Sequence, residues 1–279
     1  MKILVTGGAG FIGSHLVDKL ILDGHDVDVL DDFSTGKNKN SIANYIVEDV
    51  RSDLVHLGEY DVIYHLAALA RIQPSFENPM KTIDINVKGT ANLCNYAHKI
   101  NAKFIYAGSS SFYAGPYLNP YAFSKWQGEE VCKMFSSVYG MSSAIARFFN
   151  VYGSRHLCEG PYATVVGIFE RQFLENKALT ITGDGEQRRD FTHVNDIVRG
   201  LILMSAKTWN GDIFNLGTGV NHSINDLANM YNSKKEYIPK RPGEAKETLA
   251  DIEFSKQNLG YNPSEDIADY VKEWIKSIK

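Results

Sequence analysis

The sequence predicts an α/β protein built on a doubly wound parallel sheet, with a smaller C-terminal α/β lobe. Short apolar, β-branched segments alternate with helical segments as far as Asn150, which is the rhythm of a parallel sheet with helical crossovers. A glycine-rich turn joins the first strand directly to the first helix. Beyond Asn150 the alternation loosens, which indicates a second lobe.

The elements of this sheet follow in order along the chain. The first strand, residues 2–6, is short, apolar and β-branched, as a buried parallel strand should be. The next strands are expected at residues 26–30, 45–50, 62–66, 103–107 and 143–148. The helices between them are expected at residues 11–23, 82–100 and 121–139.

After Asn150 the expected elements are sparser. They are helices at residues 162–176 and 194–206, a short strand at 179–182 and a further sheet strand at 214–217. From residue 223 onward we expect short helices and a loop at 239–244. The predicted domains therefore interleave: residues 1–153 bind the cofactor with 190–217 returning to them, and residues 154–189 and 218–279 form the substrate lobe.

Composition narrows the class of protein. A chain of 279 residues with 44% apolar content can bury a large core. Its net charge of −4 gives no general attraction to nucleic acid or to acidic membranes. Three cysteines, far apart and without paired ligand spacing, suggest neither a disulfide framework nor a metal site. No apolar run is long enough to span a membrane. We therefore expect a soluble, cytoplasmic protein.

The glycine-rich turn predicts what the chain binds. Gly7 permits the tight turn, Gly10 lets the backbone approach a pyrophosphate, and Gly13 lets helix and strand pack closely. The helix that follows offers free N–H groups to the phosphates. After the second strand, Asp31 and Asp32 supply carboxylates that accept hydrogen bonds from ribose hydroxyls and repel a 2′-phosphate. The sequence thus predicts a Rossmann-type domain that binds NAD and not NADP.

A second motif predicts acid–base chemistry. Tyr121 and Lys125 lie one turn apart on one expected helix face. An ammonium beside a phenol favours the phenolate, so we expect the pKa of Tyr121 to fall towards working pH and make it a general base. Ser109 follows a sheet strand, at the edge where open α/β sheets bind ligands. Its hydroxyl can hydrogen-bond a substrate oxygen and assist the tyrosine.

Together the motifs resemble the extended short-chain dehydrogenase/reductase family, and more narrowly its NAD-dependent nucleotide-sugar epimerases and dehydratases. The resemblance is closest to UDP-sugar 4-epimerases and covers nearly the whole chain. It rests on TGGAGFIG at 6–13, the Asp31–Asp32 pair, Asp49–Val50, HLAA at 65–68, Asn86 in INVKGT, the serine run at 109–111, YAFSK at 121–125, RFFNVYG at 147–153, GDGEQRRDFTHVNDI at 183–197, FNLGTG at 214–219 and RPGE at 241–244.

The resemblance implies a set of NAD-binding residues: Gly7, Gly10, Phe11, Ile12, Gly13, Asp31, Asp32, Asp49, Val50, Leu66, Ala67, Ala68, Asn86, Tyr121, Lys125, Phe148 and Val151. In the family, Asp49 and Val50 would hold the adenine, and Phe148 and Val151 would line the nicotinamide pocket. The catalytic residues would be Ser109, Tyr121 and Lys125.

The resemblance also implies a nucleotide-sugar site. Its members are Ser110, Ser111, Asn150, Arg189, Arg241, Glu244 and Thr248. Arginine suits the diphosphate because its guanidinium binds phosphate oxygens in a fork geometry. Thr248 stands where a bulky tyrosine excludes N-acetylated sugars in some 4-epimerases, so UDP-GlcNAc and UDP-GalNAc would fit beside UDP-glucose and UDP-galactose. Two nearby residues are interpreted as structural: Arg188 in a surface ion pair and His193 in its helix turn.

Residues 110 and 111 distinguish the reactions that the family implies. Dehydratases have Asp-Glu directly after the catalytic residue, and decarboxylases usually have Glu at the second position, whereas this chain has Ser110 and Ser111. The expected reaction is therefore epimerisation at C4 of a UDP-sugar through a 4-keto intermediate. The alternatives are a nucleotide-sugar dehydratase, decarboxylase or reductase, or an inactive NAD-binding regulatory protein.

The segment between Ser109 and Tyr121 departs from the family pattern, because it is about ten residues shorter than usual. We expect a more open sugar pocket as a result. The resemblance further implies a homodimer formed through the helices that contain Asn86 and Tyr121.

Overall fold

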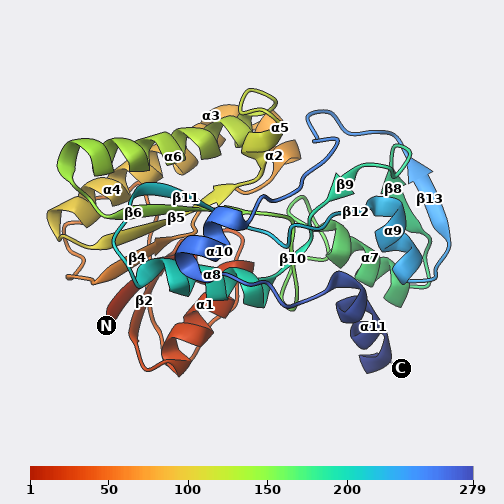
Figure 1. Cartoon of the computed structure of the whole chain (residues 1–279), viewed down its shortest axis with the longest axis horizontal. Coiled ribbons are helices and arrows are strands. Elements are labelled where there is room, and N and C mark those ends of the chain that lie inside the picture. Colours follow the sequence, from red (N-terminus) through yellow and green to blue (C-terminus); the bar gives the residue numbers. More distant parts are fainter. Residues whose placement is uncertain (279) are drawn as a thin grey trace.

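The computed structural model describes residues 1–278 and is built around a seven-stranded, all-parallel sheet (Figure 1). The strand order is β11-β6-β5-β4-β1-β2-β3. The strands are β1 (Lys2–Thr6), β2 (Asp26–Asp31), β3 (Asn44–Val47), β4 (Val62–His65), β5 (Lys103–Ser109), β6 (Ser143–Phe148) and β11 (Asn210–Leu216). The order reverses between β1 and β4, which places a ligand crevice at the carboxyl ends of these strands.

Helices cover both faces of the sheet. One face carries α4 (Gly89–Lys99) and α6 (Pro120–Tyr139), and the other carries α1 (Phe11–Leu22), α8 (Val194–Ser205) and α10 (Glu253–Leu259) (Figure 1). Each face has its own buried core: Leu16 and Leu201 belong to one cluster, and Leu93 and Phe135 to the other. The predicted fold class is confirmed.

The smaller lobe lies beside the carboxyl ends of the sheet strands (Figure 1). It contains α7 (Val165–Leu174), the parallel pair β8 (Leu179–Thr182) and β13 (Lys235–Ile238), α9 (Ile224–Met230) and α11 (Ile267–Ser277). Two-residue strands connect it to the main body: β7 (Val151–Tyr152), β9 (Arg188–Arg189), β10 (Thr192–His193) and β12 (His222–Ser223).

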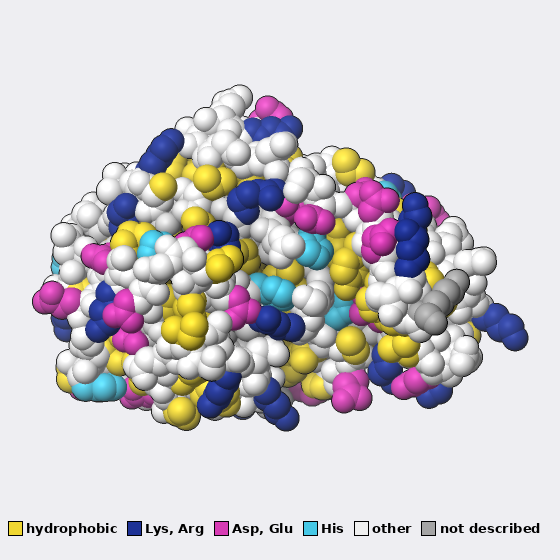
Figure 2. All heavy atoms as spheres, turned by 90° about the horizontal axis from the view of Figure 1, so that it is seen from below, with side chains coloured by type: hydrophobic (Ala, Val, Ile, Leu, Met, Phe, Trp, Pro, Cys, Tyr) yellow, Lys and Arg dark blue, Asp and Glu magenta, His cyan; other side chains and the backbone are white. Residues whose placement is uncertain are grey.

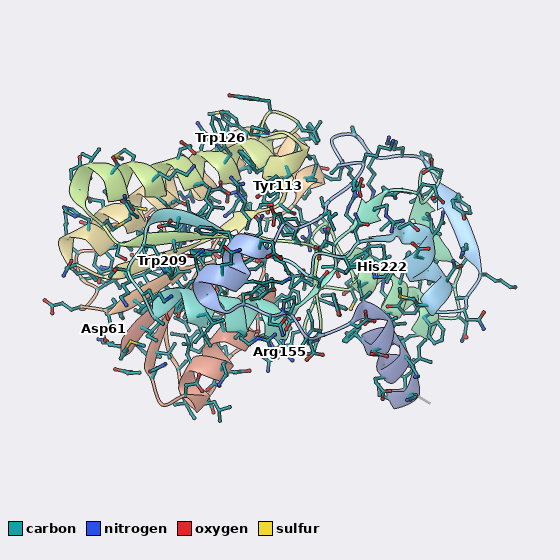
Figure 3. All side chains as sticks on the ribbon, in the orientation of Figure 1. Asp61, Tyr113, Trp126, Arg155, Trp209 and His222 are labelled. Atoms are coloured by element: carbon teal, nitrogen blue, oxygen red, sulfur yellow. The ribbon has the colours of Figure 1, made fainter. Side chains whose placement is uncertain are left out.

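The chain crosses between the two parts repeatedly. Residues 210–216 return to form the sheet edge, and α10 also packs against β11 and α8. Phe254 of α10 stacks on Phe214, with ring centroids 5.2 Å apart, and Tyr261 donates a hydrogen bond to the carbonyl of Gly217. Trp209, labelled in Figure 3, packs beside the same strand. The exact domain boundaries remain a prediction.

Helix α6 starts where its sequence requires. Asn119 caps it by accepting a hydrogen bond from the amide of Ala122, and Pro120 occupies the first turn. The helix ends at Gly140, whose φ of +70° suits glycine. The cap fixes Tyr121 in the first turn and Lys125 one turn later, at the end of the sheet where the crevice lies.

Some predicted elements differ from the structure. The helix predicted at 82–100 consists of α3 (Pro79–Ile83), a π-helical turn η1 (Asp84–Lys88) and α4. Two short helices, α2 (Ile72–Glu77) and α5 (Ser111–Ala114), and strand β13 were not predicted. The strand predicted at 45–50 ends at Val47, because Asp49 turns the chain by accepting the amide of Arg51.

Figure 2 shows one face on which acidic and basic groups are intermixed. None of the helices within residues 1–278 is long and apolar enough to cross a membrane.

Candidate active site

The turn after β1 is closed tightly by backbone contacts. Gly7 has a φ of +72°, and the amide of Gly10 donates to the Gly7 carbonyl at 3.1 Å. A Cβ on Gly13 would overlap the backbone of Gly7 and Gly8, so no larger residue fits. The turn leaves the first amides of α1 facing a cavity, which is the arrangement that binds a pyrophosphate. These residues fit NAD.

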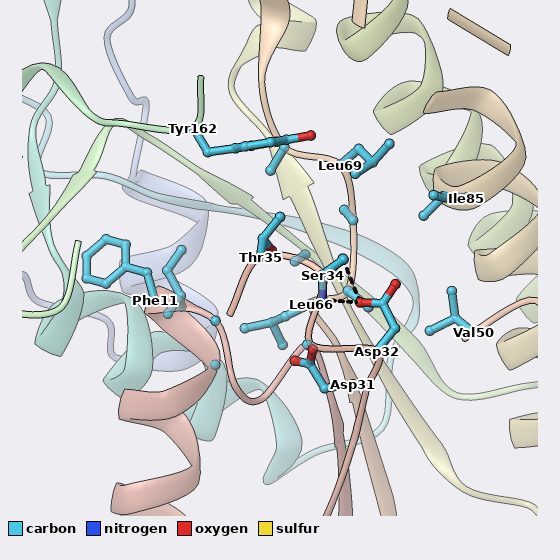
Figure 4. Close-up of a pocket in the computed structure, with 18 of the residues that line it drawn as sticks. Phe11, Asp31, Asp32, Ser34, Thr35, Val50, Leu66, Leu69, Ile85 and Tyr162 are labelled. Carbon is cyan, nitrogen blue, oxygen red and sulfur yellow. Dashed lines mark hydrogen bonds between the residues drawn. The ribbon is translucent and has the colours of Figure 1, made fainter. Parts of the chain in front are cut away.

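The cavity runs along the carboxyl ends of the central strands (Figure 4). Most of the predicted NAD-binding residues line it: Gly7, Gly10, Phe11, Ile12, Gly13, Asp31, Asp32, Asp49, Val50, Leu66, Ala67, Ala68, Tyr121, Lys125 and Phe148. One concave surface therefore joins the glycine turn to the predicted catalytic residues.

Asp31 and Asp32 have different surroundings. Asp31 is buried and accepts hydrogen bonds from the amides of Ala9 and Phe33, each at 2.9 Å, so it stabilises the glycine turn. Burial raises its pKa. Asp32 accepts from the amide and hydroxyl of Ser34 through a single oxygen (Figure 4). Asp32 is thus the carboxylate that is free to meet a ribose.

Asp49 and Val50 follow the next strand. The Asp49 carboxylate is paired with Arg51, which lowers its pKa. Val50 is buried and lines the cavity. An apolar wall beside a fixed carboxylate suits a flat base with an exocyclic amine.

Tyr121 and Lys125 both lie in the cavity wall, but the expected pKa effect is wrong. Burial raises the pKa of Tyr121, and the opposing influences are a hydrogen bond with Ser109 and the charge of Arg71. Burial lowers the pKa of Lys125 to about 8, and its Nζ lies 4.2 Å from the centre of the Tyr106 ring. The reason is that both groups are removed from water, and this outweighs their proximity on the helix.

The serine run is held together at the end of β5. Ser109 accepts hydrogen bonds from the amide and the hydroxyl of Ser111, at 3.2 and 2.9 Å. Ser110 is buried, and its amide donates to the Phe148 carbonyl. The hydroxyl of Tyr113 (Figure 3) makes no hydrogen bond with this serine run and donates instead to the side-chain oxygen of Asn215.

Two predicted NAD-binding residues do not line this cavity. Asn86 is buried in the π-helical turn, accepts the amide of Leu69 at 2.8 Å, and donates to the Leu69 carbonyl and to Ser124. Its side chain therefore positions the loop after β4 against α6, and does not face the cavity. Val151 lies in β7 and packs against the core.

The predicted nucleotide-sugar residues gather at the junction with the smaller lobe. Asn150 donates to Thr248 Oγ at 2.9 Å, and Thr248 is buried. A guanidinium nitrogen of Arg189 lies 4.0 Å from Glu244, and burial lowers the pKa of Arg189. Arg241 is exposed. Thr248 thus orients Asn150, which its sequence position did not reveal.

The loop that carries Arg241 and Glu244 is tied to the other side of the site. Gln73 donates to the carbonyl of Pro242, and Asn119 donates to that of Gly243, both at 3.0 Å. These contacts hold the RPGE segment against α2 and the start of α6. The segment that carries Arg241 and Glu244 is therefore fixed beside the helix that carries Tyr121.

Comparison with known proteins agrees with this geometry. A family model described as "NAD dependent epimerase/dehydratase family" matches residues 3–217. The chain belongs to this family. A Methanocaldococcus jannaschii protein that bears the name "Putative UDP-glucose 4-epimerase" is 36% identical over 99% of this chain and 98% of its own. UDP-glucuronic acid decarboxylase 1 of Danio rerio is 34% identical over 94% of this chain and 69% of its own. A crystal structure of a Thermotoga maritima UDP-glucose 4-epimerase with UDP-glucose superposes with a TM-score of 0.94, at 32% identity, over the full length of both chains.

The family match extends across the glycine turn, the cavity and Tyr121. This NAD-dependent enzyme also has cavity residues that the sequence did not single out: Ser34, Thr35, Glu48, Leu69, Ala70, Arg71, Ile85, Ala107, Gly108, Leu157 and Tyr162. Arg71 carries a charge beside Tyr121. Its place just after HLAA, at the carboxyl end of β4, was the signal that could have identified it.

His193 and Arg188, which were interpreted as structural from the sequence, have structural roles in this protein. His193 caps α8 by accepting the amide of Asn195 and is buried. Arg188 donates to Asn221 and lies 3.7 Å from Asp226. Neither lines the cavity within residues 1–278.

Proposed function

We propose that the protein catalyses NAD-dependent epimerisation at C4 of a UDP-sugar. The observation that carries the proposal is the distribution of acids in the cavity. Its carboxylates are Asp31, the last residue of β2, and Asp32, Glu48 and Asp49, which directly follow β2 or β3, whereas Tyr121 lies on α6. Next to Ser109 stand only Ser110 and Ser111, so no acid–base pair is available there to eliminate water across C5 and C6.

Each catalytic side chain has a definite task in this proposal. Tyr121 takes the proton from the O4 hydroxyl of the sugar, and Ser109 hydrogen-bonds the same oxygen as a carbonyl forms. Lys125 supplies a positive charge one turn away, which works against the rise that burial causes in the pKa of Tyr121. NAD bound in the cavity would supply the reversible hydride acceptor for C4 and a positive charge near the phenol. Rotation of the keto sugar before the return inverts C4.

The nucleotide diphosphate is assigned to the junction of the lobes. Arg189 and Arg241 would clamp the phosphates, Asn150 would donate to a phosphate oxygen, and Glu244 would accept from the nucleoside ribose. The spacing favours this assignment because Glu244 already lies near Arg189. Thr248 holds Asn150, so we assign it a positioning role beside the C2 substituent.

Proton NMR tests the proposal directly. The protein is incubated with NAD and, in turn, UDP-glucose, UDP-GlcNAc, UDP-glucuronate and dTDP-glucose. A galacto-configured anomeric signal without net NADH is the expected result. A stable 4-keto-6-deoxy sugar would show dehydration, a pentose product would show decarboxylation, and no conversion would favour the regulatory alternative.

Two variants of the same helix sharpen this test. Tyr121→Phe removes the proposed base, and we expect turnover to fall by about 10²–10⁴-fold. Tyr139→Phe changes an exposed tyrosine in the last turn of α6 and should leave turnover unchanged. Equal turnover by the two variants would show that Tyr121 is not the general base.

We also propose that the protein is a cytoplasmic homodimer. Met134 and Val138 are exposed apolar side chains on α6, beside α4, as a pair of helices that meets a second copy would require. Cys94 and Cys132 are free thiols with sulfurs 3.9 Å apart, which suits a reducing compartment. Light scattering that gives the mass of one chain would contradict the dimer.

A further inference from the structure

Arg71 is a cavity-lining cation that has no carboxylate within 4.0 Å among residues 1–278. Its Nε donates to the carbonyl of Tyr162 at 2.9 Å, and one terminal nitrogen donates to that of Ala70 at 3.2 Å. Burial lowers its pKa, so the group is costly to keep charged. Two backbone carbonyls fix its orientation, and the guanidinium of this cavity-lining residue keeps further N–H donors that make no hydrogen bond within the described residues.

The lack of a carboxylate partner sets Arg71 apart from most of the other arginines. In the part of the chain that the structure describes, each arginine except Arg71 and the exposed Arg241 lies within 4.0 Å of a carboxylate. The paired ones are Arg51, Arg147, Arg155, Arg171, Arg188, Arg189 and Arg199. A desolvated charge without a partner is strongly unfavourable. The ligand is therefore the natural source of the missing negative charge.

The position of Arg71 limits which anion this can be. Within the proposed function, the UDP phosphates belong to Arg189 and Arg241, and the NAD phosphates to the glycine turn. The charge of Arg71 lowers the pKa of the Tyr121 phenol, but burial raises it by more. The phenol is therefore neutral at pH 7 in the ligand-free protein and does not balance the charge of Arg71. What remains is the sugar ring next to Tyr121.

The chemistry of the ring then selects one position. Tyr121 meets O4, so a group beside its phenol lies near the substituents of C3 and C5. C3 carries a neutral hydroxyl, whereas C5 carries C6, which is a hydroxymethyl group in hexoses and a carboxylate in hexuronates. A guanidinium binds a planar carboxylate through two parallel hydrogen bonds.

We propose that Arg71 binds the C6 carboxylate of the sugar, so that UDP-hexuronates are the preferred substrates of the enzyme. The inference rests on the proposed 4-epimerase function and specifies its substrate class. UDP-hexoses leave the guanidinium unpaired and are turned over less efficiently.

The test compares kcat/KM for UDP-glucuronate and UDP-glucose in the NAD-loaded wild type, Arg71→Gln and Arg71→Lys. The wild type should prefer UDP-glucuronate, and Arg71→Gln should lower kcat/KM for UDP-glucuronate by about 100-fold. The loss for UDP-glucose should be at least about tenfold smaller in that variant, because any effect of the missing charge on Tyr121 is common to both substrates, whereas only UDP-glucuronate loses a partner for its carboxylate. Arg71→Lys should recover part of the preference because it restores the charge without the fork.

Arg171→Gln is the matched control. Arg171 also donates its Nε to a backbone carbonyl, that of Cys158, which belongs to the same connecting segment as Tyr162. It lies outside the cavity. Its replacement should leave the preference between the two substrates unchanged.

Several results would overturn the inference. A wild-type preference for UDP-glucose would do so, as would an equal loss for both substrates in Arg71→Gln. An equal loss accompanied by a shift of the pH–rate profile would show that Arg71 acts on Tyr121 alone.

Failure of the proposed function would look different. Release of CO₂ and a pentose from UDP-glucuronate would refute epimerisation, yet a selective loss in Arg71→Gln would still support carboxylate recognition. If neither substrate reacts, or if Arg71→Gln does not fold, calorimetric titration of the wild type decides the matter. UDP-glucuronate should then bind about tenfold more tightly than UDP-glucose, and equal affinities would refute the inference.

Discussion

Replacing Lys125 should stabilise the ligand-free protein at neutral pH, because this ammonium is buried and forms no ion pair within residues 1–278. The charge of Glu129, whose carboxylate is paired with Arg147, offsets only part of the effect of burial. The side chain is only 5% exposed, and its polar contact is the face of the Tyr106 ring. Burial lowers the pKa of Lys125 from 10.5 to about 8. In the unfolded chain the same group keeps its ordinary pKa. The charged form is therefore less favourable in the folded state than in the unfolded state.

The size and pH range of the effect follow from these two pKa values. The difference of about 2.5 units corresponds to roughly 3 kcal/mol of destabilisation at pH 7. Between pH 8 and pH 10.5 the unfolded state binds more protons than the folded state, so stability rises with pH in that window. About 2.5 kcal/mol of the total is recovered between pH 7 and pH 10.

Urea unfolding of the NAD-free protein from pH 7 to pH 10 measures this contribution. Lys125→Met should be more stable than the wild type at pH 7, and its advantage should shrink by about 2.5 kcal/mol by pH 10. Lys133→Met is the control, since Lys133 lies on the same helix, keeps 38% of its side chain exposed and pairs with Glu130. Its difference from wild type should vary by less than about 0.5 kcal/mol. A constant difference for Lys125→Met at every pH would refute the reasoning.

Two further substitutions test the framework of the site. Gly13→Ala should weaken NAD binding by about 100-fold or more, because its Cβ meets the backbone of Gly7 and forces the phosphate-binding turn to open; unchanged affinity in a calorimetric titration would be incompatible with that turn. Asn86→Ala should lower the free energy of unfolding by about 2–4 kcal/mol, because the amide and carbonyl of Leu69 lose their partner; denaturant unfolding measures this, and a loss below about 0.5 kcal/mol would show that water replaces the side chain.

Local patterns in the sequence were enough to predict the sheet and much of the cofactor cavity. The glycine turn is set by residues three apart, and the two carboxylates follow their strand directly, so neither depends on distant contacts. The same holds for Tyr121 and Lys125, whose spacing on one helix is fixed by the cap at Asn119. Such features can be seen in a window of a few residues.

Features that depend on distant contacts were missed or misjudged. Asn86 joins residues 17 and 38 positions away, so its π-helical turn and positioning role cannot be seen locally. The pKa of Tyr121 was expected to fall because a lysine is near, but its direction is set by burial, a tertiary property. The importance of Arg71 arises from the absence of a carboxylate around it within the described residues.

The return of β11 to the sheet has a consequence for dissecting this enzyme. β11 pairs in parallel with β6 along six registered positions, and it is contributed by residues more than sixty positions later in the chain. A fragment that stops at residue 153 would lack this partner and present the amides and carbonyls of an apolar strand to solvent. Such an edge is a template for pairing between molecules. Expressed alone, the first half of the chain should aggregate, so the protein must be produced and folded as one piece.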